Sequence, residues 1–131
     1  MQTFDISAFN WAIHEAVEAA QVGFYFEEGA CWGMAAALHS HFSELGLPVG
    51  IKFAPTGFIH VWVEVAGVSY DYRGEMTPLP GAVDLTPEEL VIVTLQHGYD
   101  EEEFLCMTAD ATAIVKTAWD NMQANTLSLI S

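Results

Sequence analysis

The chain has very few positively charged residues. Only Lys52, Arg73 and Lys116 stand against 18 aspartates and glutamates, which leaves a formal net charge of −15 at pH 7. Three cations cannot form a surface that neutralises nucleic-acid phosphates, and an anionic membrane would repel such a chain. We therefore expect no direct nucleic-acid binding and no membrane binding. The acidity suits a basic protein partner, a halotolerant surface or a decoy that presents DNA-like charge.

The sequence also lacks long apolar runs and has little cysteine. No run is long enough to span a bilayer, and the first residues do not follow the pattern of a secretory signal. Cys31 and Cys106 are too few for a disulfide framework in a chain of this size. We therefore expect a cytoplasmic protein with free thiols.

What the chain does contain is enough apolar residues for one core. It has 131 residues, 52% of them hydrophobic, so we expect a single domain over residues 1–131. The hydrophobic spacing changes from helical to alternating and back. It predicts helices over 5–21, 30–45 and 108–125, strands over 49–53, 58–65 and 68–72, a connector over 22–29, a loop over 74–87, and either a helix or a strand over 86–96. Residues 100–103 form an acidic run typical of a solvated first helical turn.

Three side chains on these elements could carry chemistry together. Cys31 follows Gly29 and Ala30 at the start of a predicted helix, where unpaired N–H groups favour a thiolate. His60 and Asp71 lie on neighbouring predicted strands joined by the tight turn at 66–67. If Val65 pairs with Val68, His60 and Asp71 share one sheet face as diagonal neighbours. The alternative is that Asp71 is a strand-end acid or a partner for Arg73.

The order of these residues resembles a known superfamily. The segments GACWGMAAAL (29–38), LGLPV (45–49), HVWVEV (60–65) and YDY (70–72) are similar to the nucleophile helix, the following strand, the histidine strand and the aspartate strand of the transglutaminase-like group of papain-fold cysteine enzymes. The similarity covers about a third of the chain. It implies an α+β, papain-like core in which the nucleophile helix packs on an antiparallel sheet of three to four strands, with further N- and C-terminal helices. It also implies Cys31 as nucleophile, His60 as general base and acid, and Asp71 as the residue that orients the imidazole.

The resemblance predicts a cysteine-dependent hydrolase or acyltransferase. It would act on a peptide, isopeptide or side-chain amide through a thioester, with hydrolysis as the default and transamidation or acetyl transfer as alternatives. Such chemistry needs no metal and no cofactor, and its substrate would be a protein or peptide that could be basic. The alternative from another class is a non-catalytic acidic binding module or inhibitor that engages a basic partner surface.

Other residues are weaker candidates. We expect Trp32, Trp62, Phe24 and Tyr25 to line a substrate groove beside Cys31, and Gln21 lies upstream as an oxyanion donor would, although the Cys31 N–H is the more natural donor. We expect Trp11, Trp119 and Phe26 to pack in the core or line a cleft, and Cys106 to pack in the core.

The histidines do not suggest a metal site. His39 and His41 are two residues apart on a predicted helix and so point about 200° away from each other, which favours surface histidines over ligands of one ion. His14 and His97 have no visible partner.

Overall fold

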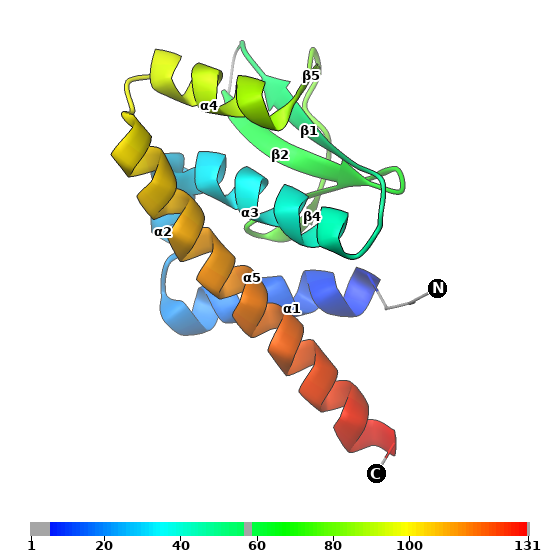
Figure 1. The fold of residues 1–131 in the computed structure, drawn as a ribbon. Helices are drawn as coiled ribbons and strands as arrows, with labels where there is room; N and C mark the ends of the chain where they lie inside the picture. Colours follow the sequence, from blue (N-terminus) through cyan, green and yellow to red (C-terminus); the bar gives the residue numbers. More distant parts are fainter. Residues whose placement is uncertain (1–5, 57–58, 131) are drawn as a thin grey trace.

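The computed structural model describes residues 6–56 and 59–130 (Figure 1). Helices and strands follow the order α1 (Ile6–Ala20), α2 (Gly23–Tyr25), η1 (Phe26–Ala30, a π-helical turn), α3 (Cys31–Glu44), β1 (Val49–Ala54), β2 (His60–Val65), β3 (Val68–Asp71), β4 (Gly74–Met76), β5 (Val83–Leu85), α4 (Pro87–Gln96) and α5 (Glu101–Ile130). None of the helices within these ranges is long and apolar enough to cross a membrane. The predicted helices and strands are present, but α5 begins at Glu101 and not at 108, and the 22–29 connector contains helical turns. Residues 5 and 58, where the first helix and the second strand are predicted to begin, lie outside the described residues.

The strands form one antiparallel sheet in the order β4-β3-β2-β1-β5. Ala66 and Gly67 both have positive φ, so they make a tight turn that matches the twist of the β2–β3 hairpin. Val65 pairs with Val68, which confirms the predicted register. The prediction of three to four strands is wrong because β4 and β5 lie inside the predicted loop. Each has only three residues, too few for alternation to stand out among prolines and glycines.

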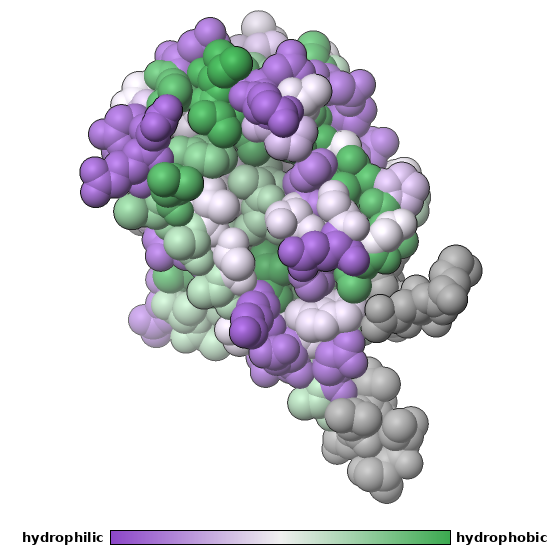
Figure 2. Space-filling view, in the orientation of Figure 1, coloured by the Kyte–Doolittle hydropathy of each residue, from purple (hydrophilic) through white to green (hydrophobic). Residues whose placement is uncertain are grey.

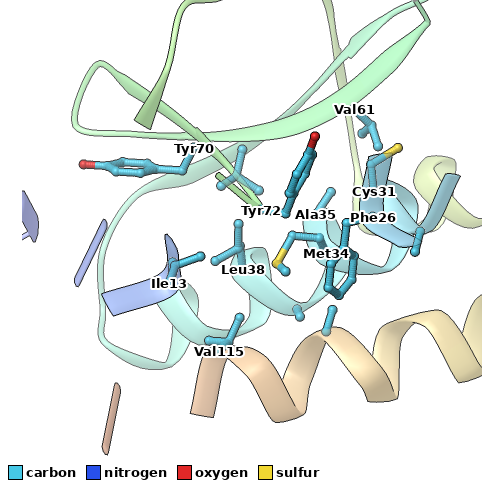
Figure 3. Packing of buried hydrophobic residues seen from close by; sticks show 14 of the residues in the cluster. Ile13, Phe26, Cys31, Met34, Ala35, Leu38, Val61, Tyr70, Tyr72 and Val115 are labelled. Atoms are coloured by element: carbon cyan, nitrogen blue, oxygen red, sulfur yellow. The ribbon is translucent and has the colours of Figure 1, made fainter. Parts of the chain in front are cut away.

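Helix α3 lies between the sheet and a second layer made by α1 and α5 (Figure 1). The β2 valines at 61, 63 and 65 are buried and face this helix, whereas His60 and Trp62 alternate to the other side of the strand. Figure 3 shows the resulting core, where Leu38 and Met34 of α3 lie between strand side chains and Val115 of α5. The mixed α+β fold is therefore shown, with α3 as its central helix.

Glycine allows α3 and α5 to approach closely. A Cβ built on Gly33 would lie 2.3 Å from the Met107 carbonyl carbon and 2.6 Å from the Thr108 nitrogen. Both atoms belong to the α5 backbone and cannot move away independently of their helix. The contact fixes the first turn of α3, which begins at Cys31, against α5.

Segment 86–96 is a helix. Thr86 and Glu89 form a complete capping box, Pro87 occupies the first turn, and Leu90 and Thr94 are buried one turn apart. These local signals outweigh the strand preference of the β-branched residues that follow.

The acidic run is exposed, as expected. Asp100 to Glu103 are exposed at the start of α5, and the region where α4 meets α5 is strongly hydrophilic in Figure 2. Two expectations about buried residues are wrong. Cys106 is exposed, and Trp11 is 62% exposed, because both lie on the outer faces of their helices.

Candidate functional site

A kink in the helical backbone at Gly29 makes Cys31 the first residue of α3. Gly29 has φ of +133°, a conformation that side chains other than glycine rarely adopt, and a Cβ there would lie 2.0 Å from the Tyr99 hydroxyl. The helical path is interrupted at this point and restarts after Ala30, which provides no side-chain cap. The N–H groups of the first turn of α3 are therefore directed toward the region around the Cys31 side chain.

The Cys31 thiol is buried and protonated at rest. The residue is 7% exposed, and its Sγ lies 3.8 Å from the Gly29 carbonyl oxygen as a weak donor. Burial raises the pKa of Cys31 to about 11, and the negative charge of Asp71 adds to the increase. Backbone N–H groups of Val61 and Trp32 act in the opposite direction but are outweighed. The expectation that the helix start leaves a thiolate is therefore corrected, because desolvation exceeds the effect of the helix terminus.

His60 and Asp71 form a buried hydrogen-bonded pair. His60 is the first residue of β2 and Asp71 the last of β3, and the two residues are 5% and 1% exposed. His60 Nε2 lies 2.9 Å from Asp71 Oδ2. The hairpin register brings them together on one face, as the alternation of the strands predicted. A proton on Nε2 directed at the carboxylate makes Nδ1 the basic nitrogen of the ring.

Asp71 is also bound by Arg73. The Arg73 backbone N–H donates to Oδ1 at 2.9 Å, and its Nη2 donates to Oδ2 at 2.9 Å. Burial alone would raise the pKa of Asp71, but hydrogen bonds from His60 and Arg73 lower it below its usual value. The two partners considered for Asp71 are thus both present, and the carboxylate is ionised.

The Cys31 sulfur lies near the backbone of β2, at the residue that follows His60 in the chain. The N–H that acts on the Cys31 sulfur belongs to Val61, the residue after His60, and Figure 3 shows the Val61 and Cys31 side chains side by side. The Asp71 charge also acts on the same sulfur. Three segments that are separate in sequence thus meet at one end of α3.

His60 is also reached from outside. It lines a pocket of about 450 Å³ together with Arg73, Glu75, Met76, Thr77 and Leu79. The segment after β4 borders this pocket on its way to β5 at the opposite edge of the sheet. The pocket therefore borders the imidazole, although His60 itself is only 5% exposed.

The predicted substrate-groove residues have different roles. Trp32 and Trp62 are 4% and 1% exposed, so we reassign both to packing. The Trp32 ring packs against Phe53 and His97, and Trp62 Nε1 donates to Ser69 Oγ at 3.1 Å. Both tryptophans lie among apolar residues in the sequence. Such a pattern is found both for side chains that pack in a core and for side chains that line a cleft, so it could not decide between the two.

Tyr25 remains accessible near the start of α3. It is 38% exposed and its hydroxyl donates to Asp110 Oδ2 at 2.8 Å. Partial burial and this carboxylate raise the pKa of Tyr25 to about 12. Tyr25 lines a pocket of about 260 Å³ with Ala30 and Cys106, among others. The side chain of Phe24 lies outside the described part of the structure.

Gln21 is not placed as an oxyanion donor. It is exposed in the left-handed turn after α1, with φ of 58°. Within residues 6–56 and 59–130, none of the contacts joins it to Cys31. The backbone N–H groups of Cys31 and Trp32, which act on the sulfur itself, are better placed to serve as donors.

The histidines outside the pair have structural surroundings. His41 is not a simple surface residue: its ring packs against Phe9 and Trp119, and its Nε2 is buried without a hydrogen-bond partner in the described structure. His97 Nδ1 lies 2.8 Å from the Val93 carbonyl oxygen. No group of three metal-ligating side chains occurs among the described residues.

Sequence reasoning missed Tyr99 and Ser69. Tyr99 packs its hydroxyl against Gly29, and Ser69 accepts the Trp62 indole hydrogen bond. A glycine two residues before the cysteine is a signal for the first contact, and the β2–β3 register predicts that Ser69 shares the face of Trp62.

Comparisons of the chain with protein-family models, with curated proteins and with solved structures find no match.

Proposed function

We propose that this protein is a cysteine-dependent acyl-transfer enzyme with a papain-like, transglutaminase-like core. Cys31 is its nucleophile, His60 its general base and acid, and Asp71 the residue that orients the imidazole. The observation that carries this proposal is the buried 2.9 Å contact between His60 Nε2 and Asp71 Oδ2, one residue from the strand N–H that acts on the Cys31 sulfur. A buried histidine whose Nε2 is held by a carboxylate keeps Nδ1 as the nitrogen that can act as a base for a thiol within its reach.

The raised pKa determines how the thiol is activated. With a pKa of about 11, the thiol alone would be ionised in only about one molecule in ten thousand at pH 7. An enzyme with this site therefore cannot rely on a resting thiolate. The base must remove the proton as the sulfur attacks, which makes His60 indispensable and explains why its tautomer is held by a buried carboxylate.

His60 Nδ1 accepts the thiol proton while Sγ forms a bond to the amide carbonyl carbon, and the carbonyl oxygen becomes an oxyanion near the N–H groups of the first turn of α3. The carbon–nitrogen bond then breaks, and the imidazolium returns its proton to the leaving amine. Water or a second amine, deprotonated by the same imidazole, attacks the thioester and releases the Cys31 thiol. Hydrolysis and transamidation differ only in this last acceptor.

The substrate class is a peptide, isopeptide or side-chain amide. The proposal requires no metal or cofactor because the thiol and imidazole supply nucleophile, base and acid. The net charge of −15 favours substrates with positive charge near the reacting amide.

An activated ester tests the nucleophile without knowledge of the substrate. We would remove the exposed thiol with Cys106→Ser and treat the folded chain with p-nitrophenyl acetate, following p-nitrophenolate release and locating the acetyl group by peptide mass spectrometry. Acetylation should occur at Cys31 and should slow by about 100-fold in His60→Ala, the usual contribution of a general base.

The controls separate catalysis from folding. His39→Ala removes another α3-region histidine and should leave the rate unchanged, and Cys31→Ser should abolish the thioester. Circular dichroism and urea unfolding verify that each variant is folded. No acetyl group on Cys31, or an unchanged rate in a folded His60→Ala chain, would refute the enzyme proposal.

Burial of Cys31 and exposure of the acidic run favour a second candidate, a non-catalytic acidic module that binds a basic partner. In that case Cys31→Ser leaves binding to a lysine-rich peptide intact, while replacing Glu101, Glu102 and Glu103 by glutamine weakens it. An inert Cys31 together with this result would favour the second candidate.

A further inference from the structure

Arg73 contacts both oxygens of the Asp71 carboxylate. Besides the 2.9 Å contacts from its backbone N–H and Nη2, its Nε lies 3.5 Å from Oδ1. His60 Nε2 shares Oδ2 with Nη2. The guanidinium carbon lies 5.3 Å from the centroid of the Tyr72 ring, which holds the arginine from a second side. The orientation of the Asp71 carboxylate is thus fixed by contacts with both Arg73 and His60.

The chain has few cations that could do this. Arg73 is one of three basic residues, and Lys52, which lies on β1, pairs with the exposed Asp84. A carboxylate that is 1% exposed is strongly disfavoured unless a cation or several hydrogen bonds compensate its charge. His60 supplies one hydrogen bond, to Asp71 Oδ2. The remaining compensation at Asp71 therefore comes from Arg73.

We propose that Arg73 is a positioning residue of the triad, which keeps the Asp71 carboxylate oriented toward His60 Nε2 and thereby keeps Nδ1 available as the base for Cys31. The inference rests on the proposed function and extends it to a fourth residue. Arg73 touches none of the reacting atoms and acts only through Asp71.

Several titratable or charged groups surround Asp71 and define the pH response. His60 approaches from β2, Cys31 from α3, Arg73 from the residues after β3, and Glu75 is exposed on β4 beside the same pocket. Of these, only His60 and Arg73 stabilise the carboxylate. Loss of Arg73 therefore raises the pKa of Asp71 and allows it to protonate in mildly acidic solution, where the hydrogen bond to His60 changes.

The test compares Arg73→Gln, Arg73→Lys and Lys52→Gln in the Cys106→Ser chain. Lys52→Gln is the matched control, because it also removes one positive charge from the sheet but leaves Asp71 untouched. Carboxyl NMR follows the titration of Asp71, and the p-nitrophenyl acetate reaction gives the pH profile of Cys31 acetylation. Urea unfolding establishes that each variant is folded.

We expect Arg73→Gln to raise the pKa of Asp71 and to slow acetylation about fivefold near pH 6, with a smaller deficit at higher pH, where Asp71 is ionised again. Arg73→Lys should restore most of the rate because it restores the charge, although it loses the two-pronged geometry. Lys52→Gln should reproduce the parent profile. If Arg73→Gln fails to fold, Arg73→Lys still tests the inference. Its pKa of Asp71 and its pH profile of acetylation should be shifted from those of the parent chain in the same direction, by a smaller amount.

Two results would overturn the inference. One is an unchanged Asp71 titration and an unchanged profile in Arg73→Gln. The other is a rate loss equal at every pH and not rescued by Arg73→Lys, which indicates a purely structural role. Both differ from failure of the proposed function, in which Cys31 of the parent chain is not acetylated or His60→Ala has no effect; that failure would refute the positioning role as well.

Discussion

Replacing Asp71 by asparagine tests how far the site depends on a buried charge. The substitution keeps the size and one acceptor oxygen but removes the negative charge. The asparagine NH₂ group then faces a donor, either on His60 or on Arg73, where the carboxylate had accepted a hydrogen bond. The geometry of the hairpin is otherwise preserved.

The expected cost follows from these contacts. A buried hydrogen bond to a charged acceptor contributes about 1.5 to 3 kcal/mol to stability. The Arg73 side chain is 56% exposed, so its contacts with Asp71 contribute less because solvent screens them. With one acceptor retained, we expect Asp71→Asn to lower the free energy of unfolding by about 2 to 3 kcal/mol at neutral pH. A domain of this size has enough stability for the variant to fold.

The pH dependence gives the sign of the effect. Because the pKa of Asp71 is lower in the folded chain than in the unfolded chain, its stabilisation is fully present above the unfolded value of about 4 and is lost as the pH falls through the folded value. Urea unfolding at a series of pH values should therefore show a constant difference between wild type and Asp71→Asn above about pH 5. The difference should shrink below about pH 4.

The matched control is Asp84→Asn. This aspartate also pairs with a cation, Lys52, but its side chain is 79% exposed, so we expect a change within about 0.5 kcal/mol. The reasoning would be refuted by similar losses in the two variants, or by an Asp71→Asn difference that persists unchanged at low pH. Acetylation of Cys31 should fall in Asp71→Asn, but less than in Cys31→Ser, because orientation is disturbed while the nucleophile remains.

Two further predictions concern the surroundings of the site. Gly33→Ala places a Cβ 2.3 Å from the Met107 carbonyl carbon, so it should destabilise the chain by about 2 kcal/mol by urea unfolding despite the helix preference of alanine, whereas Gly50→Ala, with open space around its Cβ, should be tolerated. Equal effects would argue against close packing of α3 and α5. Burial lowers the pKa of His41, so the unfolded chain binds more protons and stability should decrease as the pH falls below about 6.5. His41→Phe should flatten this dependence in unfolding measurements and His39→Gln should not; an unchanged slope in His41→Phe would contradict the assignment.

The sequence by itself determined the elements with strong periodicity. Helical spacing before Ala20 and after Thr108 and alternation through Val61, Val63 and Val65 predicted α1, α5 and β2, because a face that must be buried imposes its period on the chain. The two-residue turn favoured the hairpin register in which Val65 pairs with Val68, and the structure has this register. This register, together with the alternation of side chains along the strands, predicted from the sequence that His60 and Asp71 share one face of the sheet.

Only the tertiary structure decided the state of the groups in the site. Whether a helix start favours a thiolate depends on how much water remains around the sulfur, and the packing of Cys31 into the core reverses the direction that its position in the helix suggests. The short edge strands β4 and β5 form because neighbouring strands provide partners, which no local pattern records. Likewise, the spacing in the sequence left open whether Asp71 pairs with His60, with Arg73 or with both. In the folded chain its carboxylate contacts both side chains at once.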